Sequence, residues 1–272
     1  MAFLLFDPAR WPAREAITRI TGVVAVTAML AWRILQTPRF PGLMSDVPFL
    51  RDFFARLPTI ASKTWDINAY YARYHYTLTE IRWLWSWRLA IWILETAILA
   101  GYVLAWLTRD RATNVARGFM EVVFPLVVAG LPFVIVMTPY TFDEWMHASS
   151  PMHMTLLGTI TALLLVGELV NVVGLLTLRR SFTIMTEART LIRGGIYRFI
   201  RHPLYAGQFI TFLGYTLLHL QPATLGLFIF FVTAQVLRAK IEEQKLAAAF
   251  PEYAEYQRTT GMFFPRFRTQ PR

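Results

Sequence analysis

A short segment rich in cations and tyrosines, residues 195–207, leads directly into an apolar stretch of this sequence. Pro203 lacks a backbone N–H and has a fixed φ, so it favours the first turn of a helix. The N-terminus of such a helix presents unpaired N–H groups and a partial positive charge. With Arg201 and His202 beside it, this turn is suited to hold an anion at the boundary between water and lipid.

A pair of carboxylates, Glu242 and Glu243, follows the last apolar stretch, with Arg238 one turn before them. Helix-forming residues continue from Arg238 to about Ala249, so we expect this helix to project beyond the membrane by about two turns. The carboxylates should then lie on the same side as residues 195–207, where they would suit a ligand ammonium. Taken alone, they could be a solvated helix end, and Arg238 with Glu242 an ordinary i,i+4 surface pair.

Two further polar residues, Glu168 and Asn171, lie inside a predicted membrane span and share a helix face through their i,i+3 spacing. Intramembrane carboxylates are costly to bury and often functional, and Glu95 is another in a different span. These residues predict a polar path near a substrate, although a structural hydrogen bond between helices explains them equally well.

A weaker candidate is a metal site on the outer side. Its residues, Asp143, Glu144, His147 and His153, lack a recognised ligand spacing, so we expect no metal.

The composition indicates a membrane protein. The chain is 56% hydrophobic and 15% aromatic, more apolar than a soluble domain of 272 residues needs. It contains no cysteine, which excludes a thiol nucleophile and a disulfide framework. The net charge of +10 indicates membrane topology and contact with anionic lipid rather than with nucleic acid. Arginine supplies nearly all of the positive charge, a bias that favours a bacterial source.

Six apolar segments approach the roughly 20 residues needed to cross a bilayer, which predicts an all-α, integral membrane helical bundle with about six transmembrane helices. They are 17–35, 89–107, 119–138, 154–178, 204–220 and 223–237. Only Gln221 and Pro222 separate the last two, so these predict a tight helical hairpin. Arginine-rich connectors and an acidic loop at 140–152 place both termini in the cytoplasm by the positive-inside rule.

The long loop 36–88 fits that rule less well, because it carries several arginines on the predicted outer side. Its second half is crowded with Trp and Tyr, which predicts an interfacial helix around 65–88 leading into the second span. We therefore divide the chain into an N-terminal membrane region, 1–152, and a C-terminal core, 153–272.

The ordered motifs of this core resemble the isoprenylcysteine carboxyl methyltransferase family, which is related to the membrane phospholipid methyltransferases. They are Gly195-x-Tyr197-Arg198-x-x-Arg201-His202-Pro203-x-Tyr205-x-Gly207, a membrane hairpin, Glu242-Glu243-x-x-Leu246, Glu252-Tyr253-x-x-Tyr256 and a late Pro265. The resemblance covers about 163–266, and four blocks in the expected order are far more specific than any one of them. Gly194-Gly195 departs from the more common Gly-Pro at that turn.

The resemblance implies a methyltransferase core that uses S-adenosylmethionine, bound in a cytoplasmic C-terminal segment. The implied cofactor-binding residues are Gly195, Tyr197, Arg201, His202, Tyr205, Gly207, Glu242 and Glu243. Of these, the tyrosines, Arg201 and His202 would surround the cofactor carboxylate, and a glutamate would face its amino group or ribose. Arg238 would lie near the methyl-transfer point, and we expect Glu168 and Asn171 to border a lateral opening to lipid as further catalytic residues. Transfer from a sulfonium needs alignment and desolvation more than an acid or base.

The acceptor would be lipophilic: a carboxylate, amine or hydroxyl of a lipid, isoprenoid or prenylated molecule, reached within the membrane. One alternative is an NADPH-dependent sterol-type membrane reductase, a class with a related motif in which Asn replaces Leu204. The leucine and the Glu242–Glu243 pair favour the methyltransferase. A second alternative is a non-catalytic membrane or transport protein that retains the fold. The expected location is a bacterial inner membrane with both termini cytoplasmic.

Overall fold

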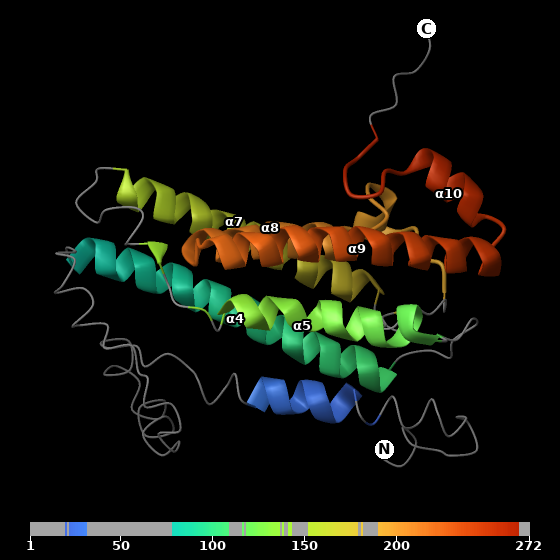
Figure 1. Cartoon of the computed structure of the whole chain (residues 1–272), viewed down its shortest axis with the longest axis horizontal. Helices are drawn as coiled ribbons and strands as arrows, with labels where there is room; N and C mark the ends of the chain where they lie inside the picture. The colour runs from blue at the N-terminus through green and yellow to red at the C-terminus, as the bar shows by residue number, and fades with distance from the viewer. Residues whose placement is uncertain are drawn as a thin grey trace, which may run out of the picture.

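The computed structural model describes residues 20, 22–31, 78–108, 116, 118–136, 138, 141–142, 152–178, 181 and 190–266, which form a helical bundle (Figure 1). Its helices are α4 (Leu78–Thr108), α5 (Phe124–Val136), α7 (His153–Leu178), α8 (Pro203–Leu218), α9 (Pro222–Ala249) and α10 (Tyr253–Thr259). A π-helical turn, Phe119–Val123, precedes α5, and a 3-10 turn, Gly195–Arg198, precedes α8. In these described residues the only β-structure is one isolated bridge, so the all-α prediction is confirmed.

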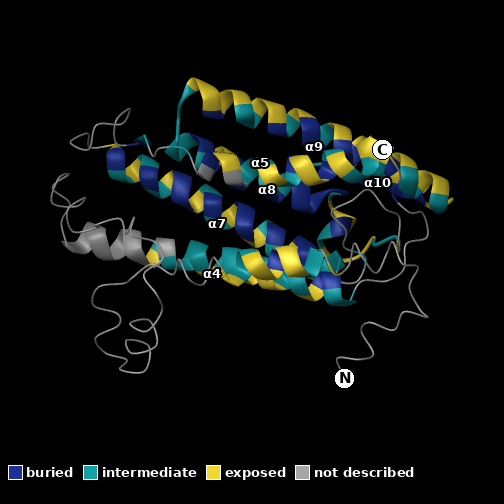
Figure 2. Cartoon of the chain, turned by 60° about the horizontal axis from the view of Figure 1, so that its bottom comes forward, coloured by how far each residue is buried: buried dark blue, intermediate teal, exposed yellow. Residues whose placement is uncertain are grey.

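Three helices of the core run side by side. α8 packs along α7 on one side and α9 on the other, while α4 packs against α7 and α5 packs against α8 and α9 (Figures 1 and 2). Phe212 of α8, Phe231 of α9 and Val128 of α5 are buried together where these three helices meet. The short segment with α10 folds back over the end of α9 (Figure 1).

Within the described part of the chain, three helical segments are long and apolar enough to cross a membrane: Leu89–Thr108, His153–Leu178 and Pro222–Ala249. Their outward faces are apolar as well. Leu169 and Leu176 of α7, and Ile229 and Phe230 of α9, each expose more than half of their surface. Large exposed apolar side chains in this number suit lipid rather than water. The chain is therefore an integral membrane protein.

The remaining predicted spans are only partly confirmed, because their described helices are shorter than a membrane crossing requires. The helices Gly22–Ala31 and Phe119–Pro132 are apolar but shorter, and α8 has 16 residues. Of the predicted interfacial helix around 65–88, residues 65–77 lie outside the described residues. Leu78 to Arg88 form the start of α4, which continues into the second predicted span. Six spans and the orientation of the termini stay predictions, as does the division at 152.

The boundaries that frame the hairpin agree with the sequence prediction. α8 begins at Pro203, and α9 continues past the apolar stretch to Ala249. Gln221 and Thr224 form a reciprocal capping box at the start of α9, which satisfies backbone groups that a helix end leaves open. The tight hairpin is confirmed.

Glycines allow α7 and α8 to approach closely. A Cβ added at Gly167 would lie 2.7 Å from the backbone nitrogen of Thr211 and 2.9 Å from the carbonyl oxygen of Gly207. A Cβ at Gly214 would meet Leu164 at 2.7 Å. Small residues permit this close backbone packing between helices in membranes.

We expect Gly167→Ala to destabilise the bundle by about 1–3 kcal/mol, because the added methyl group meets backbone atoms that can move only if the helices separate. Gly226→Ala is the matched control, since an added Cβ there has no atom within 4 Å. The control should leave stability unchanged or raise it by up to about 1 kcal/mol. Thermal unfolding of the purified protein in one detergent measures both, and equal melting temperatures would show that the helices are not tightly packed at Gly167.

Candidate active site

The turn before α8 lies beside the C-terminal segment. The backbone N–H of Arg201 donates to Gly261 O at 2.8 Å, and that of His202 donates to Met262 O at 3.0 Å. Gly195 opens the turn with φ +57°, a conformation that side chains other than glycine rarely adopt. Segments about 60 residues apart in sequence therefore form one site at the end of the bundle.

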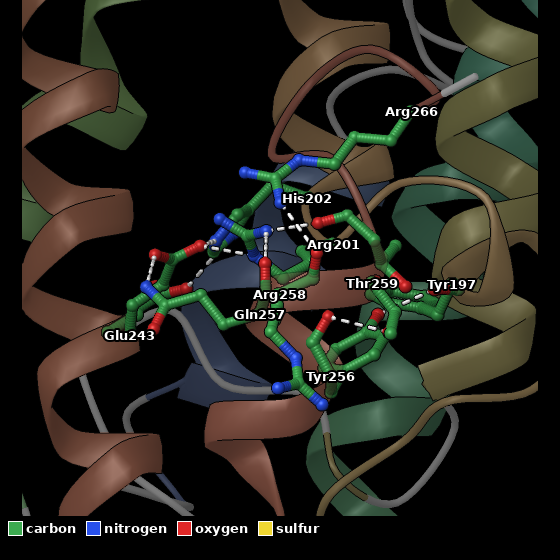
Figure 3. A network of polar contacts seen from close by, with 11 residues as sticks. Tyr197, Arg201, His202, Glu243, Tyr256, Gln257, Arg258, Thr259 and Arg266 are labelled. Carbon is green, nitrogen blue, oxygen red and sulfur yellow. Dashed lines mark hydrogen bonds and ion pairs between the residues drawn. The ribbon is translucent and has the colours of Figure 1, made fainter. Parts of the chain in front are cut away.

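Arg201 is buried and bonds both α9 and the C-terminal segment (Figure 3). Its Nε lies 2.7 Å from Glu243 Oε1, and its Nη1 donates to the carbonyl oxygens of Gln257, at 2.9 Å, and Thr260. Gln257 also donates from Nε2 to Glu243 Oε2 at 2.8 Å. Arg201 thus joins α9 to the C-terminal segment through a buried ion pair.

The imidazole of His202 lies between the two carboxylates. Its Nε2 is 3.0 Å from Glu243 Oε1, and its Nδ1 is 3.9 Å from Glu242 Oε2. The ring stacks on Tyr205, with centroids 5.4 Å apart and planes 3° from parallel, and meets Phe263 at 5.8 Å. This stack brings Phe263 of the C-terminal segment over the start of α8.

Glu242 connects three parts of the sequence motif. It accepts a hydrogen bond from the Tyr205 hydroxyl and lies 3.4 Å from Arg238 Nε. The Arg238 guanidinium also lies over the Tyr205 ring, 5.1 Å from its centroid. The side chain of Arg238 is only 6% exposed and that of Glu242 is 22% exposed. The pair therefore belongs to the site and is not the ordinary surface pair that the spacing alone allowed.

Two tyrosines close the base of the site. Tyr256 of α10 donates from its hydroxyl to Tyr197 O at 2.5 Å. Burial raises the pKa of Tyr256 to about 12 and holds the pKa of Tyr197 well above its usual range, with the Glu242 charge as the next cause at Tyr197. Both phenols stay protonated near neutral pH, so Tyr256 remains a hydrogen-bond donor.

The intramembrane polar residues form a second group. Glu168 and Asn171 are buried on α7, 6% and 5% exposed. Tyr102 of α4 interacts electrostatically with Glu168 and Arg238 and shares a hydrogen bond with Gln208 of α8. Arg238 therefore lies within electrostatic range of Tyr102 and also pairs with Glu242. Glu95, the other intramembrane carboxylate, accepts a hydrogen bond from Tyr215 of α8.

The predicted residues divide as follows. Seven of them come together at the start of α8 and the C-terminal part of α9, with Gly195 at the turn before α8: Tyr197, Arg201, His202, Tyr205, Arg238, Glu242 and Glu243. Gly207 lies away from this cluster, where a Cβ would come within 2.5 Å of Asn171 Oδ1.

Among the weak metal candidates, Asp143, Glu144 and His147 lie outside the described residues. Buried His153 packs against Phe142 with ring centroids 5.0 Å apart. The described residues include no group suited to a metal ion.

Several residues of the site were not predicted. One of them, Gln235, recurs at helical spacing on one face of α9 with the predicted Arg238 and Glu242, a signal that the sequence offers. Tyr102, Gln208 and Phe263 carry no such signal, because their places depend on how separate helices and the C-terminal segment pack.

Comparison with known proteins agrees with the motif blocks. Residues 160–248 match the sequence profile of the isoprenylcysteine carboxyl methyltransferase (ICMT) family, which confirms the resemblance for that part of the chain. This region includes α8, all of α9 except its last residue, and every site residue from Arg201 to Glu243.

Two curated proteins are similar to part of this chain. The protein-S-isoprenylcysteine O-methyltransferase of Saccharomyces cerevisiae is 31% identical over 118 residues, which cover 41% of this chain and 48% of the yeast protein. The cobalt-zinc-cadmium resistance protein CzcN of Cupriavidus metallidurans is 38% identical over 78 residues, 28% of this chain and 36% of CzcN. The chain thus spans less than half the length of either relative.

Proposed function

We propose, from the membership of residues 160–248 in the ICMT family, that this chain is a membrane methyltransferase that transfers a methyl group from S-adenosylmethionine to a lipophilic acceptor. The observation that carries the proposal is the meeting of two motif blocks and Arg238 at one carboxylate. Glu242 bonds Tyr205, pairs with Arg238 and lies near His202. A helical hairpin with a purely structural role would not require these polar groups to meet at one point.

The residues present suit the methyl donor. A carboxylate can bind its ammonium group, and N–H donors can bind its carboxylate. Glu242 is the more accessible of the two glutamates, with 22% of its side chain exposed against 8% for Glu243. We therefore assign the contact with the ammonium group or ribose to Glu242. Glu243 has a different role in this proposal, because Arg201, His202 and Gln257 already bond it.

The first turn of α8 would receive the donor's carboxylate. No side chain caps the N-terminus of this helix, and His202 and Tyr205 flank it. Tyr197 and Gly195 support the turn from behind. Arg201, whose Nε and Nη1 are bonded within the protein, would position the C-terminal segment over the site.

When bound, S-adenosylmethionine supplies a methyl group on a sulfonium, whose C–S bond breaks with its electron pair passing to sulfur as the acceptor's nucleophile bonds to carbon. Around this centre, Arg238 and the stacked rings of His202, Tyr205 and Phe263 would orient the reactants and exclude water. Glu168 and Asn171, the other proposed catalytic residues, would border the route of an acceptor that enters from the lipid between helices.

The location follows the same reasoning. A lipophilic acceptor and a water-soluble donor meet most readily at the membrane surface, so the site should lie at the cytoplasmic face. We propose a bacterial inner membrane with both termini cytoplasmic, as the arginine-rich connectors predict.

Binding of S-adenosylhomocysteine, the product of the donor, tests the proposal. Isothermal titration calorimetry of the detergent-purified protein should detect binding, and Glu242→Ala should weaken it by about 1.5–3 kcal/mol, the contribution of a hydrogen bond to a charged group. Glu255→Ala is the control, because Glu255 is a carboxylate of the same C-terminal segment with 72% of its side chain exposed. The control should bind as the wild type does.

The same titration separates the alternatives. Binding of NADPH in place of S-adenosylhomocysteine would favour the sterol-type reductase. Binding of neither would favour a non-catalytic membrane protein. Wild-type affinity in Glu242→Ala would remove Glu242 from the donor site.

A further inference from the structure

The π-helical turn before α5, Phe119–Val123, connects a part of the chain outside the family match to the site. Gly118 precedes the turn with φ +73°, a conformation that favours glycine. Val122 of the turn packs against the buried cluster that contains Trp106 and Leu204, and Leu204 lies in the first turn of α8. This packing fixes the position of the turn. Turns of this kind are rare and often occur at functional sites.

Glu121, in the same turn, forms an ion pair with α9. Its Oε2 lies 2.6 Å from Lys245 Nζ, and the two side chains are 23% and 11% exposed. Lys245 lies in the part of α9 that we expect beyond the membrane, three residues after Glu242. Partial burial reduces screening by water and salt, so this pair is stronger than one on an open surface. Glu121 therefore sets where the Lys245 charge lies.

Lys245 has a second carboxylate within reach on its own helix. Residues three apart on a helix are neighbours, whereas residues two apart do not face each other, so the spacing favours Glu242 over Glu243. A lysine ammonium is a point charge on a flexible stem, which can turn toward either Glu121 or Glu242. In the structure it is paired with Glu121, while Glu242 is paired with Arg238.

The two oxygens of Glu242 differ in their contacts. Oε1 accepts a hydrogen bond from the Tyr205 hydroxyl and lies 3.4 Å from Arg238 Nε. Oε2 lies 3.9 Å from His202 Nδ1, beyond hydrogen-bond distance. In the proposed function, Oε2 is the atom open to the ammonium group of the methyl donor. A lysine ammonium carries the same charge and the same N–H donors as that group, so it would compete for this oxygen.

We infer that Glu121 is a positioning residue, which holds the Lys245 ammonium away from Glu242 and so keeps Glu242 Oε2 open to the donor. The inference rests on the proposed function and adds to it a residue from outside the family match. A purely structural ion pair predicts the same effect from the loss of either partner. Competition predicts different effects, because losing Glu121 releases the competing ammonium, whereas losing Lys245 removes it.

Calorimetric titration of S-adenosylhomocysteine into the full chain in detergent tests this difference. Glu121→Gln should weaken binding by about 10-fold, the lower end of what the loss of a hydrogen bond to a charged group causes. Lys245→Met should bind as the wild type does. Adding Lys245→Met to Glu121→Gln should restore the lost affinity. Glu255→Gln is the control, because it makes the same change at a carboxylate that is 72% exposed, and it should have no effect.

Melting temperatures separate this effect from a loss of stability. Glu121→Gln and Lys245→Met break the same ion pair, so both should lower the melting temperature by similar amounts. Only Glu121→Gln should also lose affinity. Glu121→Asp keeps the charge and should retain most of the affinity.

Three results would overturn the inference: wild-type affinity in Glu121→Gln, an equal loss of affinity in Lys245→Met, or a double variant that binds no more tightly than Glu121→Gln. In each case a wild type that binds S-adenosylhomocysteine leaves the proposed function standing. If the wild type does not bind, the proposed function fails and this inference fails with it.

Discussion

Replacing Arg201 by methionine should lower the melting temperature of this protein more than any other single change in the site. The substitution leaves the Glu243 carboxylate, 8% exposed, without its closest cation, and it removes the donor to two carbonyl oxygens of the C-terminal segment. Breaking a buried ion pair by removing one partner costs about 3–5 kcal/mol. Differential scanning fluorimetry in detergent measures the loss.

The same change should release the C-terminal segment. Arg258 of α10 has 78% of its side chain exposed, so trypsin can attack there once the helix detaches. We expect cleavage after Arg258 to be at least about 10-fold faster than in the wild type, because local opening controls proteolysis of a folded protein. Mass spectrometry of the fragments reports the site of cleavage.

Two variants sharpen this test. Arg193→Met removes an exposed arginine of the same connector and should change neither stability nor cleavage. Adding Glu243→Leu to Arg201→Met removes the stranded charge, so the double variant should recover part of the lost stability. A double variant no more stable than Arg201→Met would mean that the contacts with the carbonyl oxygens, and not the ion pair, dominate.

Replacing Arg238 by methionine should have the largest effect on catalysis. In the proposed function this guanidinium lies over Tyr205, beside Glu242, at the point where charge moves as the methyl group transfers. Removal of one preorganised electrostatic group typically costs about 100–1,000-fold in kcat. The initial rate of transfer of radiolabelled methyl from S-adenosylmethionine to a lipophilic acceptor measures this effect.

The affinity for S-adenosylhomocysteine should change much less, by at most about 10-fold, because Arg238 does not itself receive the donor. Lys240→Met is the control: it removes an exposed cation two residues further along α9 and should leave the rate unchanged. Arg238→Lys keeps the charge but not the planar group over Tyr205, so its rate should be intermediate. Wild-type turnover in Arg238→Met would exclude Arg238 from the reaction.

The helices of the core could be predicted from local features of the sequence. Pro203 fixed the start of α8, and the run of helix-forming residues after Arg238 extended α9 to Ala249. Apolar length marked α7 and α9 as spans. These properties depend on neighbouring residues only, and a bilayer requires backbone hydrogen bonds to be satisfied within each helix.

The ordered motifs also predicted which residues lie together. Arg201, His202, Glu242 and Glu243 were expected close to one another, and they are in contact. Their partners could not be predicted, since each carboxylate could have served either arginine. The lengths of the turn and of the helices decide that Arg201 takes Glu243 while Arg238 takes Glu242.

The buried polar group of Tyr102, Gln208 and Gln235 shows most clearly which contacts the sequence alone does not predict. A glutamine in an apolar helix indicates that a partner exists, because burying an unbonded amide is costly, but it does not say on which helix. Gln235 meets Gln208, and Gln208 meets Tyr102, only because α4, α8 and α9 converge there. The sequence by itself determined the apolar spans within α4, α7 and α9 and the motif residues, which depend on local composition. Tertiary packing decided the pairing of charges and of the buried amides, because both depend on distances between helices far apart in the chain.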